Sequence, residues 1–359
     1  MKYEQEFPLE KIKTDGVDKK FNLSDPNERK EYFETKAGEE IKKLRKFFDE
    51  GNTFIAYLLG KKNAGKGTYT KLLMEIFGKD KIGHISVGDI VRSVHEDMED
   101  ETRKKELLDY LHENYRGYIT PEQAIDALLG RDTKTLLPNE FTMALIQREI
   151  NKAGKKSIFL DGFPRNLDQV SYALFFKQLV DFRNDPDIFV AIDIPESVID
   201  ERMKYRVVCP TCHAPRNTKL FATEKVGYDE EKKEFYLMCD DSDCNHARMG
   251  AKEGDNMGIE SIRERVELDG QLIDKIFSLH GIKRVLLRNA VPTDKAKEYL
   301  DDYEITPEYY YELDENTKEV KTLERPFAVK DDEGTEVYSL LAPPVIISFL
   351  RQLVKALEL

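Results

Sequence analysis

The sequence predicts an α/β fold in which a parallel five-stranded sheet is covered by helices on both faces. Two observations carry this prediction. Short apolar runs with strand character alternate with longer stretches of helical periodicity. A glycine-rich loop also follows the first apolar run directly and opens a helix. Because each crossover helix returns the chain to the same edge of the sheet, strands spaced in this way pair in parallel.

The elements follow in order along the chain. We expect strands at residues 53–59, 81–85, 157–160, 188–193 and 283–288. We expect helices at about residues 28–50, 69–77, 138–153, 167–182, 196–206, 259–280 and 292–303. Residues 93–135 are polar and helix-prone with a break at Gly117 and Pro121, and they read as an insertion into the core.

The composition narrows the class of protein. With 359 residues, 40% hydrophobic and 35% charged, the chain fits a globular protein with a sizeable core. A formal charge of −13 argues against a nucleic-acid partner, since basic surfaces supply most of that affinity. No apolar signal region or membrane-spanning run is present in the sequence. We therefore expect a cytoplasmic protein, without a membrane partner and monomeric.

The loop after the first strand reads Gly60-Lys61-Lys62-Asn63-Ala64-Gly65-Lys66-Gly67-Thr68. Backbone N–H groups of such a loop converge on phosphate oxygens, and the positive end of the next helix favours the same anion. Lys66 stands where a lysine would reach the β- and γ-phosphates of a nucleotide. The alternative is a tight turn with a solvated lysine, and the strand and helix that flank the loop favour the nucleotide site.

The residue after Lys66 narrows the class further. Many such loops place the Mg²⁺-binding hydroxyl there, whereas this chain has Gly67 and then Thr68. Together with three further segments, this variant resembles the nucleoside monophosphate kinases, and adenylate kinases in particular. The segments are 84–92, 158–169 with Asp-Gly-Phe-Pro-Arg at its centre, and 191–206. The resemblance covers about residues 53–303.

The resemblance implies roles for individual residues. The donor ATP would be held by Gly60, Asn63, Ala64, Gly65, Lys66, Gly67, Thr68, Arg202 and Arg206. The acceptor AMP would be held by Val87, Gly88, Arg92, Gly162, Arg165, Gln169 and Arg265. Catalysis would depend on Lys66, Asp161, Arg165, Arg206 and Arg265, with Asp161 orienting the waters around the Mg²⁺ that accompanies ATP. Such a set suits phosphoryl transfer, in which positioning and charge stabilisation supply most of the acceleration.

The chain departs from the family pattern at three places. The first of two expected lid arginines is replaced by Lys252 or supplied by Arg248, with Arg263 a third candidate. Val87 replaces a threonine that contacts the acceptor base in the family, which leaves another nucleoside monophosphate open as acceptor. Lys61, Lys62 and Asn63 replace small residues and proline, so their charges either strengthen triphosphate binding or point outward.

The only cysteines are Cys209, Cys212, Cys239 and Cys244. In a chain with no secretion signal, this clustering indicates metal rather than disulfides. Two pairs separated by a strand-like stretch suit tetrahedral, structural Zn²⁺ in a lid at residues 207–255. Either His213 or His246 could take the place of one cysteine. Four buried thiols without metal are the alternative.

These segments give an expected domain plan. Residues 1–52 form a helical extension, and residues 53–303 form the adenylate kinase-like region. That region contains a monophosphate-binding insertion at 86–137 and the zinc-type lid at 207–255. Residues 304–359 form an extension of β-hairpins, with turns near 314–316 and 331–334, and a helix from Pro343.

The function expected from the resemblance is reversible, Mg²⁺-dependent phosphoryl transfer from ATP to AMP, giving two ADP, with closure of the lid. A kinase for another nucleoside monophosphate is the same-fold alternative. A nucleic-acid-binding NTPase with a zinc ribbon and an interaction protein with degenerate catalysis are alternatives of other classes. The acidic charge and the Asp-Gly-Phe-Pro-Arg motif speak against the NTPase.

Overall fold

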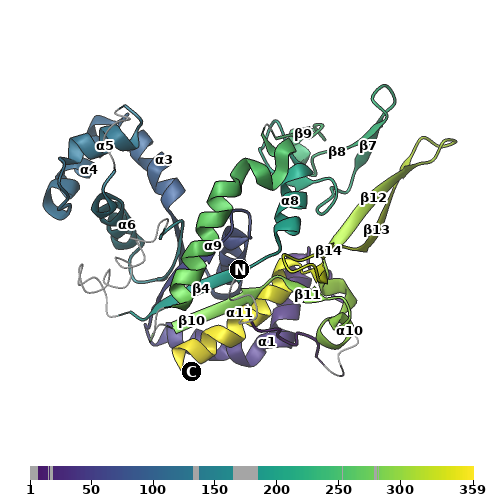
Figure 1. The fold of residues 1–359 in the computed structure, drawn as a ribbon, viewed down its shortest axis with the longest axis horizontal. Helices are drawn as coiled ribbons and strands as arrows, with labels where there is room; N and C mark the ends of the chain where they lie inside the picture. The colour runs from purple at the N-terminus through teal and green to yellow at the C-terminus, as the bar shows by residue number, and fades with distance from the viewer. Residues whose placement is uncertain are drawn as a thin grey trace.

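The computed structural model describes residues 7–14, 16, 19–131, 137–164, 185–252, 254–278, 281 and 283–359. A five-stranded sheet with the order β10-β4-β1-β3-β2 lies at its centre (Figure 1). The strands are β1 (Ile55–Gly60), β2 (Ile82–Ser86), β3 (Ser157–Asp161), β4 (Asp187–Asp193) and β10 (Lys283–Arg288). Every neighbouring pair is parallel. The predicted α/β class and the five-stranded parallel sheet are confirmed.

The two faces of the sheet belong to two separate hydrophobic clusters. In β1, Ala56 and Leu58 pack on one side, whereas Tyr57 and Leu59 pack on the other, as the two-residue period of a strand requires. The first face is covered by α1 (Pro26–Asp49), α2 (Lys66–Phe77) and α11 (Ala342–Leu357). The second is covered by α6 (Asn139–Ala153) and α9 (Arg263–Phe277). The three-layer arrangement explains why the strands are apolar throughout.

The insertion between β2 and β3 is helical. It contains α3 (Val87–Asp97), α4 (Glu101–Asn114) and α5 (Pro121–Leu128), which lie at the left of Figure 1. The predicted break falls between α4 and α5, where Thr120 caps the new helix and Pro121 takes its first position. A buried pair between Asp97 and Arg148, at 2.8 Å, fastens α3 to α6.

A small β-rich lid follows β4 and α8 (Glu196–Lys204). It contains a three-stranded sheet, β6-β5-β9, and a hairpin of β7 and β8. The bounds are β5 (Arg206–Val208), β6 (Pro215–Asn217), β7 (Val226–Asp229), β8 (Glu234–Leu237) and β9 (Gly250–Ala251). Short 3-10 segments occupy Ser242–Cys244 and Asp255–Ile262, and the second leads into α9. The predicted helix over 259–280 is therefore a 3-10 segment followed by an α-helix. The helix expected at 167–182 lies outside the described residues.

The helix predicted over 292–303 is wrong. Residues Ala290–Pro292 form β11, and only Ala296–Tyr299 (α10) and Asp302–Glu304 (3-10) are helical. The reason is tertiary. Pro292 belongs to β11, which pairs antiparallel with β15 (Glu336–Ser339), almost fifty residues further along the chain, and the Tyr299 carbonyl accepts from the N–H groups of Ile12 and Lys13. Such long-range pairing overrides the helical tendency of a short segment.

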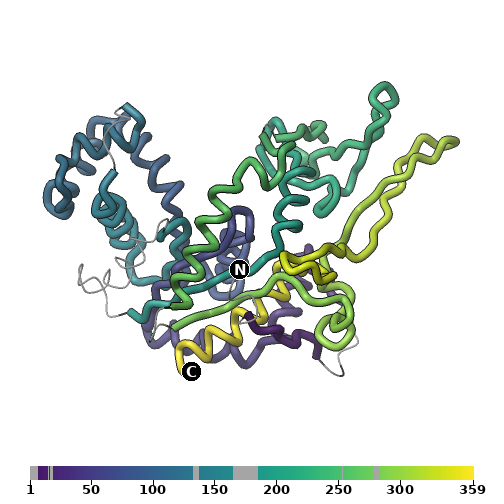
Figure 2. The backbone as a smooth tube through the Cα atoms, viewed as in Figure 1, coloured from purple at the N-terminus to yellow at the C-terminus, as the bar shows by residue number. Residues whose placement is uncertain are grey.

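The C-terminal hairpins are where the sequence places them. The pair β12 (Pro307–Leu313) and β13 (Val320–Pro326) is antiparallel, and β14 (Ala328–Lys330) pairs with β15. Figure 2 shows the β12–β13 hairpin projecting beside the lid. Tyr309 N–H donates to the lid carbonyl of Lys219 at 2.7 Å, and the Tyr311 hydroxyl donates to that of Thr218 at 2.6 Å. The hairpin therefore touches the lid directly.

Both terminal segments pack on the core. The Phe349 ring of α11 lies edge-on to Phe159 of β3, with 5.8 Å between ring centres. In α1, Lys36 is fully buried and pairs with Asp301 at 2.6 Å and with Glu304 at 3.1 Å. None of the helices in the described part of the chain is both long enough and apolar enough to cross a bilayer.

Candidate functional site

The glycine loop joins β1 to α2 at the carboxyl edge of the sheet. Gly60 ends the strand so close to β4 that a Cβ there would lie 3.1 Å from the Ile192 carbonyl oxygen. Gly65 caps α2 with φ of 97°, a conformation that glycine adopts without strain. Ala64, within the loop, is fully buried. These constraints leave the backbone folded around the first turn of α2, as an anion-binding loop requires.

Lys66 is the first residue of α2, and its side chain folds back along the loop. Its ammonium group donates to the Gly60 carbonyl at 2.8 Å and to the Lys61 carbonyl at 3.3 Å. It also lies 3.9 Å from a carboxylate oxygen of Asp161, the last residue of β3. The structure thus brings the two residues together at the ends of neighbouring strands.

Arg265 and Asp269 lie on α9, above the same edge. They form an ion pair at 2.8 Å, and Asp269 is almost completely buried. Burial raises the pKa of Asp269, while the charges of Arg265 and Lys66 oppose the shift. The carboxylate of Asp269 therefore holds Arg265 on the side of α9 that faces the loop. Sequence reasoning missed Asp269, whose only signal is its spacing of four residues from Arg265.

Arg202 and Arg206 come from α8 and β5. Arg202 donates to the carbonyl of Asn63 in the glycine loop at 3.2 Å, so α8 touches the loop directly. Arg206 forms a two-pronged pair with Asp255, with one nitrogen–oxygen distance of 2.8 Å. Asp255, to which the sequence analysis gave no role, comes three residues after Lys252, the candidate replacement for the first lid arginine.

The expected acceptor residues are divided between described and undescribed parts of the chain. Val87 and Gly88 begin α3, where Val87 is buried in the core of the insertion. Arg92 is exposed one turn later and pairs with Asp89. Gly162 follows β3 with φ of 81°. Arg165 and Gln169 lie outside the described residues.

Thr68 and Gly67 lie in the first turn of α2. Thr68 is exposed, and a Cβ on Gly67 would meet no atom within 4 Å in the described part of the chain. Packing within the protein therefore gives no reason for a glycine at this position.

The structure excludes one of the two alternatives that the sequence left open for Lys61. Its side chain is about 2% exposed, so it does not point outward. Its ammonium group lies 2.6 Å from a carboxylate oxygen of Asp332, in the turn between β14 and β15. Lys62 is exposed, and Asn63 adopts a positive φ of 67°.

Two of the candidates for the first lid arginine are engaged elsewhere. Arg248 pairs with Asp229 at 2.6 Å and with Glu234 at 2.7 Å, both on the β7–β8 hairpin. Arg263 pairs with Glu196 and Glu260. Both arginines thus stabilise the lid and its base in this structure.

The four cysteines form one cluster in the lid. Their Sγ atoms all lie within 4.8 Å of one another, and those of Cys212 and Cys239 are 3.7 Å apart. A tetrahedral zinc site with zinc–sulfur bonds of about 2.3 Å separates its sulfurs by about 3.8 Å. The donor set therefore fits Zn²⁺. His246 turns Nδ1 to the Cys239 carbonyl oxygen, 3.2 Å away, and not to the sulfurs.

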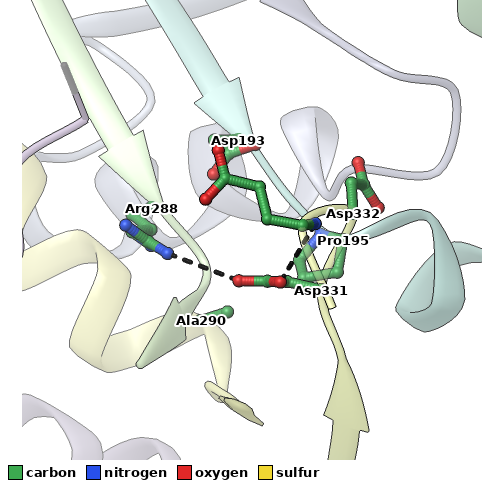
Figure 3. Close-up of a pocket in the computed structure, with 7 residues that line it drawn as sticks. Asp193, Pro195, Arg288, Ala290, Asp331 and Asp332 are labelled. Atoms are coloured by element: carbon green, nitrogen blue, oxygen red, sulfur yellow. Dashed lines mark hydrogen bonds and ion pairs between the residues drawn. The ribbon is translucent and has the colours of Figure 1, made fainter. Parts of the chain in front are cut away.

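A small pocket opens beside the ends of β4 and β10 (Figure 3). Its lining residues are Asp193, Pro195, Arg288, Ala290, Asp331, Asp332 and Glu333. Arg288 faces Asp331 at 3.9 Å, whereas the Asp332 carboxylate points away from Arg288. The C-terminal segment thus forms one wall beside the glycine loop, an arrangement that was not predicted from the sequence.

The parallel sheet, the glycine loop and the helix that follows it define a P-loop α/β protein. A family model described as an AAA domain matches residues 59–207. The chain is 32% identical over 214 residues to an adenylate kinase of Clostridium novyi, covering 59% of this chain and 79% of the relative. It is 27% identical over 239 residues to one of Thermotoga neapolitana, covering 65% and 89%. A third, from Lactiplantibacillus plantarum, is 32% identical over 177 residues, covering 49% and 68%.

The chain belongs to the adenylate kinase family.

Proposed function

We propose that this protein transfers a phosphoryl group reversibly from ATP to AMP and so forms two ADP. The observation that carries the proposal is the meeting of Lys66, Asp161 and the Arg265–Asp269 pair at one edge of the sheet. The names of the similar proteins support it. In this reaction the bond between the γ-phosphorus and the bridging oxygen of ATP breaks, and a phosphate oxygen of AMP bonds to that phosphorus.

The donor side of the proposed site is the glycine loop. Its amides and Lys66 would hold the phosphates, with Gly60, Asn63, Ala64, Gly65, Gly67 and Thr68 forming the cradle. Mg²⁺ would accompany the triphosphate and neutralise developing charge. Asp161 would orient the waters around that ion. Arg202 already contacts the loop, so α8 is suited to carry the lid toward ATP.

The acceptor side would lie toward α3. Arg92, Arg165 and Arg265 would bind the phosphate of the monophosphate, because guanidinium groups make two-pronged contacts to phosphate. Val87, Gly88, Gly162 and Gln169 would contact the remainder of the acceptor. When the lid closes, the insertion at 86–137 and the lid at 207–255 would move relative to the rest of the core at 53–303.

A kinase for another nucleoside monophosphate is the second candidate. Val87 at the start of α3 favours it, because valine has no hydroxyl group to hydrogen-bond the acceptor base. A coupled assay distinguishes the two. The protein is given ATP and Mg²⁺ with AMP, CMP, UMP or GMP in turn, and ADP formation is followed. We expect the highest kcat/KM with AMP. Higher values with CMP or UMP would show that the acceptor is that monophosphate and not AMP. No turnover with any acceptor would refute the proposed activity.

A further inference from the structure

Lys61 is a buried cation inside the glycine loop. Three oxygen atoms surround its ammonium group: Asp332 Oδ2 at 2.6 Å, the Ile194 carbonyl at 3.4 Å and Glu196 Oε1 at 3.5 Å. A buried charge is tolerated only when such partners replace the lost water. Asp332 makes the shortest of the three contacts.

Asp332 makes a second contact with its other carboxylate oxygen. Oδ1 accepts from the backbone N–H of Glu196 at 2.7 Å, at the start of α8, where the helix dipole favours a negative charge. One turn of the C-terminal segment therefore joins the glycine loop to the helix that leads into the lid. The Ser197 hydroxyl adds a third link by donating to the Lys330 carbonyl at 2.7 Å.

The backbone of Lys61 also holds the side chain of Lys66 in place. The carbonyl oxygens of Gly60 and Lys61 accept from the Lys66 ammonium group. The Lys61 carbonyl also accepts from the Ala64 N–H at 3.0 Å, which closes the turn of the loop. Any shift of Lys61 would consequently move the backbone that holds Lys66.

We propose that Asp332 is a positioning residue for ATP binding, which acts on the glycine loop through Lys61 and not by touching the nucleotide. The inference rests on the nucleotide site of the proposed function. It also gives the C-terminal segment a role in binding: its turn over Asp331 to Glu333 sets the conformation of the loop before ATP arrives. The C-terminal turn therefore contributes to the donor site without contacting the nucleotide.

The physical reason is the asymmetry of buried ion pairs. Removing one partner leaves an uncompensated buried charge, whereas removing both leaves none. In Asp332→Asn the buried Lys61 ammonium group would keep only the longer of its two carboxylate contacts, to Glu196, which also pairs with Arg263. It would therefore move toward water, and the loop backbone would follow. In Lys61→Met the Asp332 carboxylate loses its cation, but it is 22% exposed to water and still accepts from the Glu196 N–H, so its charge is compensated without moving the loop.

The test is ATP and AMP binding to the full chain by isothermal titration calorimetry. We expect Asp332→Asn to weaken ATP binding by about tenfold or more, with AMP binding unchanged. Glu333→Gln, an exposed neighbour in the same turn, should match the wild type. ATP binding by Asp332→Asn equal to the wild type would overturn the inference, and so would an equal loss of AMP binding, since both nucleotides would then report a general defect.

A double variant separates positioning from direct contact. Lys61→Met alone should bind ATP within about threefold of the wild type, and adding it to Asp332→Asn should restore most of the lost affinity. A loss in Lys61→Met as large as in Asp332→Asn would show that Lys61 itself binds phosphate, and would overturn the proposal. If Asp332→Asn fails to fold, the double variant decides: wild-type affinity supports positioning, and weak ATP binding by a folded double variant refutes it. A wild-type protein that binds no ATP would instead refute the proposed function.

Discussion

The side chain of Lys66 supplies a fixed positive charge to the candidate site. Its ammonium group lies against the Gly60 carbonyl and 3.9 Å from Asp161, at the end of two neighbouring strands. In phosphoryl transfer, a fixed cation at this place would stabilise charge that develops on the phosphate oxygens.

The Lys66→Met variant should lose about a hundredfold or more in kcat, because it removes one fixed charge from the reacting phosphates. The measurement is the coupled ADP assay at saturating ATP and AMP. Lys71→Met is the matched control, since Lys71 is an exposed lysine on the same helix. Equal activity in the two variants would contradict a catalytic role for Lys66.

His84 offers a pH test. It lies on β2, where burial lowers its pKa from the usual value of 6.5, and its Nε2 has no hydrogen-bond partner within the described residues. As the pH falls through about 6.5, the unfolded chain takes up a proton that the folded one does not, so stability falls. We expect a smaller decrease between pH 7.5 and 5.5 in His84→Leu, measured by urea unfolding. An identical decrease in both proteins would refute this account.

At the scale of elements, α11 is part of the core and not an appendage. It covers the same face of the sheet as α1 and α2, with Phe349 fully buried against Phe159. The helix itself could be predicted from the sequence, where apolar residues follow Pro343 and Pro344. The sheet face against which α11 packs could not be predicted, because contacts across nearly two hundred residues leave no local periodicity.

Phe349→Ala should lower the free energy of unfolding by about 3–5 kcal/mol, since it opens a cavity in a packed core. Denaturant unfolding followed by circular dichroism measures the loss. Lys355→Ala, on the exposed side of α11, is expected to change stability by less than about 0.5 kcal/mol. A small loss for Phe349→Ala would mean that α11 contributes little to the core.

The cysteine cluster organises the lid as an element. Its sulfurs are spaced as a tetrahedral site requires, and few other buried apolar residues hold this part together. We expect about one zinc per chain by elemental analysis, and its loss in Cys209→Ser and Cys239→Ser. Chelation should loosen the lid and leave the sheet folded. A metal-free protein with an equally protected lid would contradict a structural zinc.

At the scale of the whole molecule, the terminal segments join parts that lie far apart in the sequence. The β12–β13 hairpin contacts the lid. The ring centres of Tyr311 in the hairpin and Phe235 in the lid lie 5.6 Å apart, and Glu308 of the hairpin pairs with Lys219 of the lid at 3.1 Å. The lid is therefore attached to the body at α8, at α9 and through this hairpin (Figure 2).

Tyr311→Ala removes both the ring contact and the hydrogen bond to the Thr218 carbonyl. We expect a local loss of about 2 kcal/mol, seen as faster hydrogen exchange of the Tyr309 amide and of lid peptides. Tyr310→Ala is the control, because Tyr310 is one residue away and 44% exposed. Unchanged exchange in Tyr311→Ala would show that the hairpin does not steady the lid.

The sequence by itself determined the α/β class, the five strands of the parallel sheet, the glycine loop and the spacing of the cysteines. These features are local: a strand alternates by two residues, a loop conformation needs glycine, and metal ligands come in close pairs. The site roles of Arg165 and Gln169 remain predictions from motif alone, because both residues lie outside the described part of the chain.

Only the tertiary structure decided what lies against these local features. It broke the helix expected at 292–303 into short helical turns after β11, because β15 and the N-terminal segment supply partners from far along the chain. It turned Lys61 inward, because Asp332 supplies a carboxylate from 271 residues away. Charge compensation and strand pairing both depend on which distant groups meet, and no window of the sequence contains both partners.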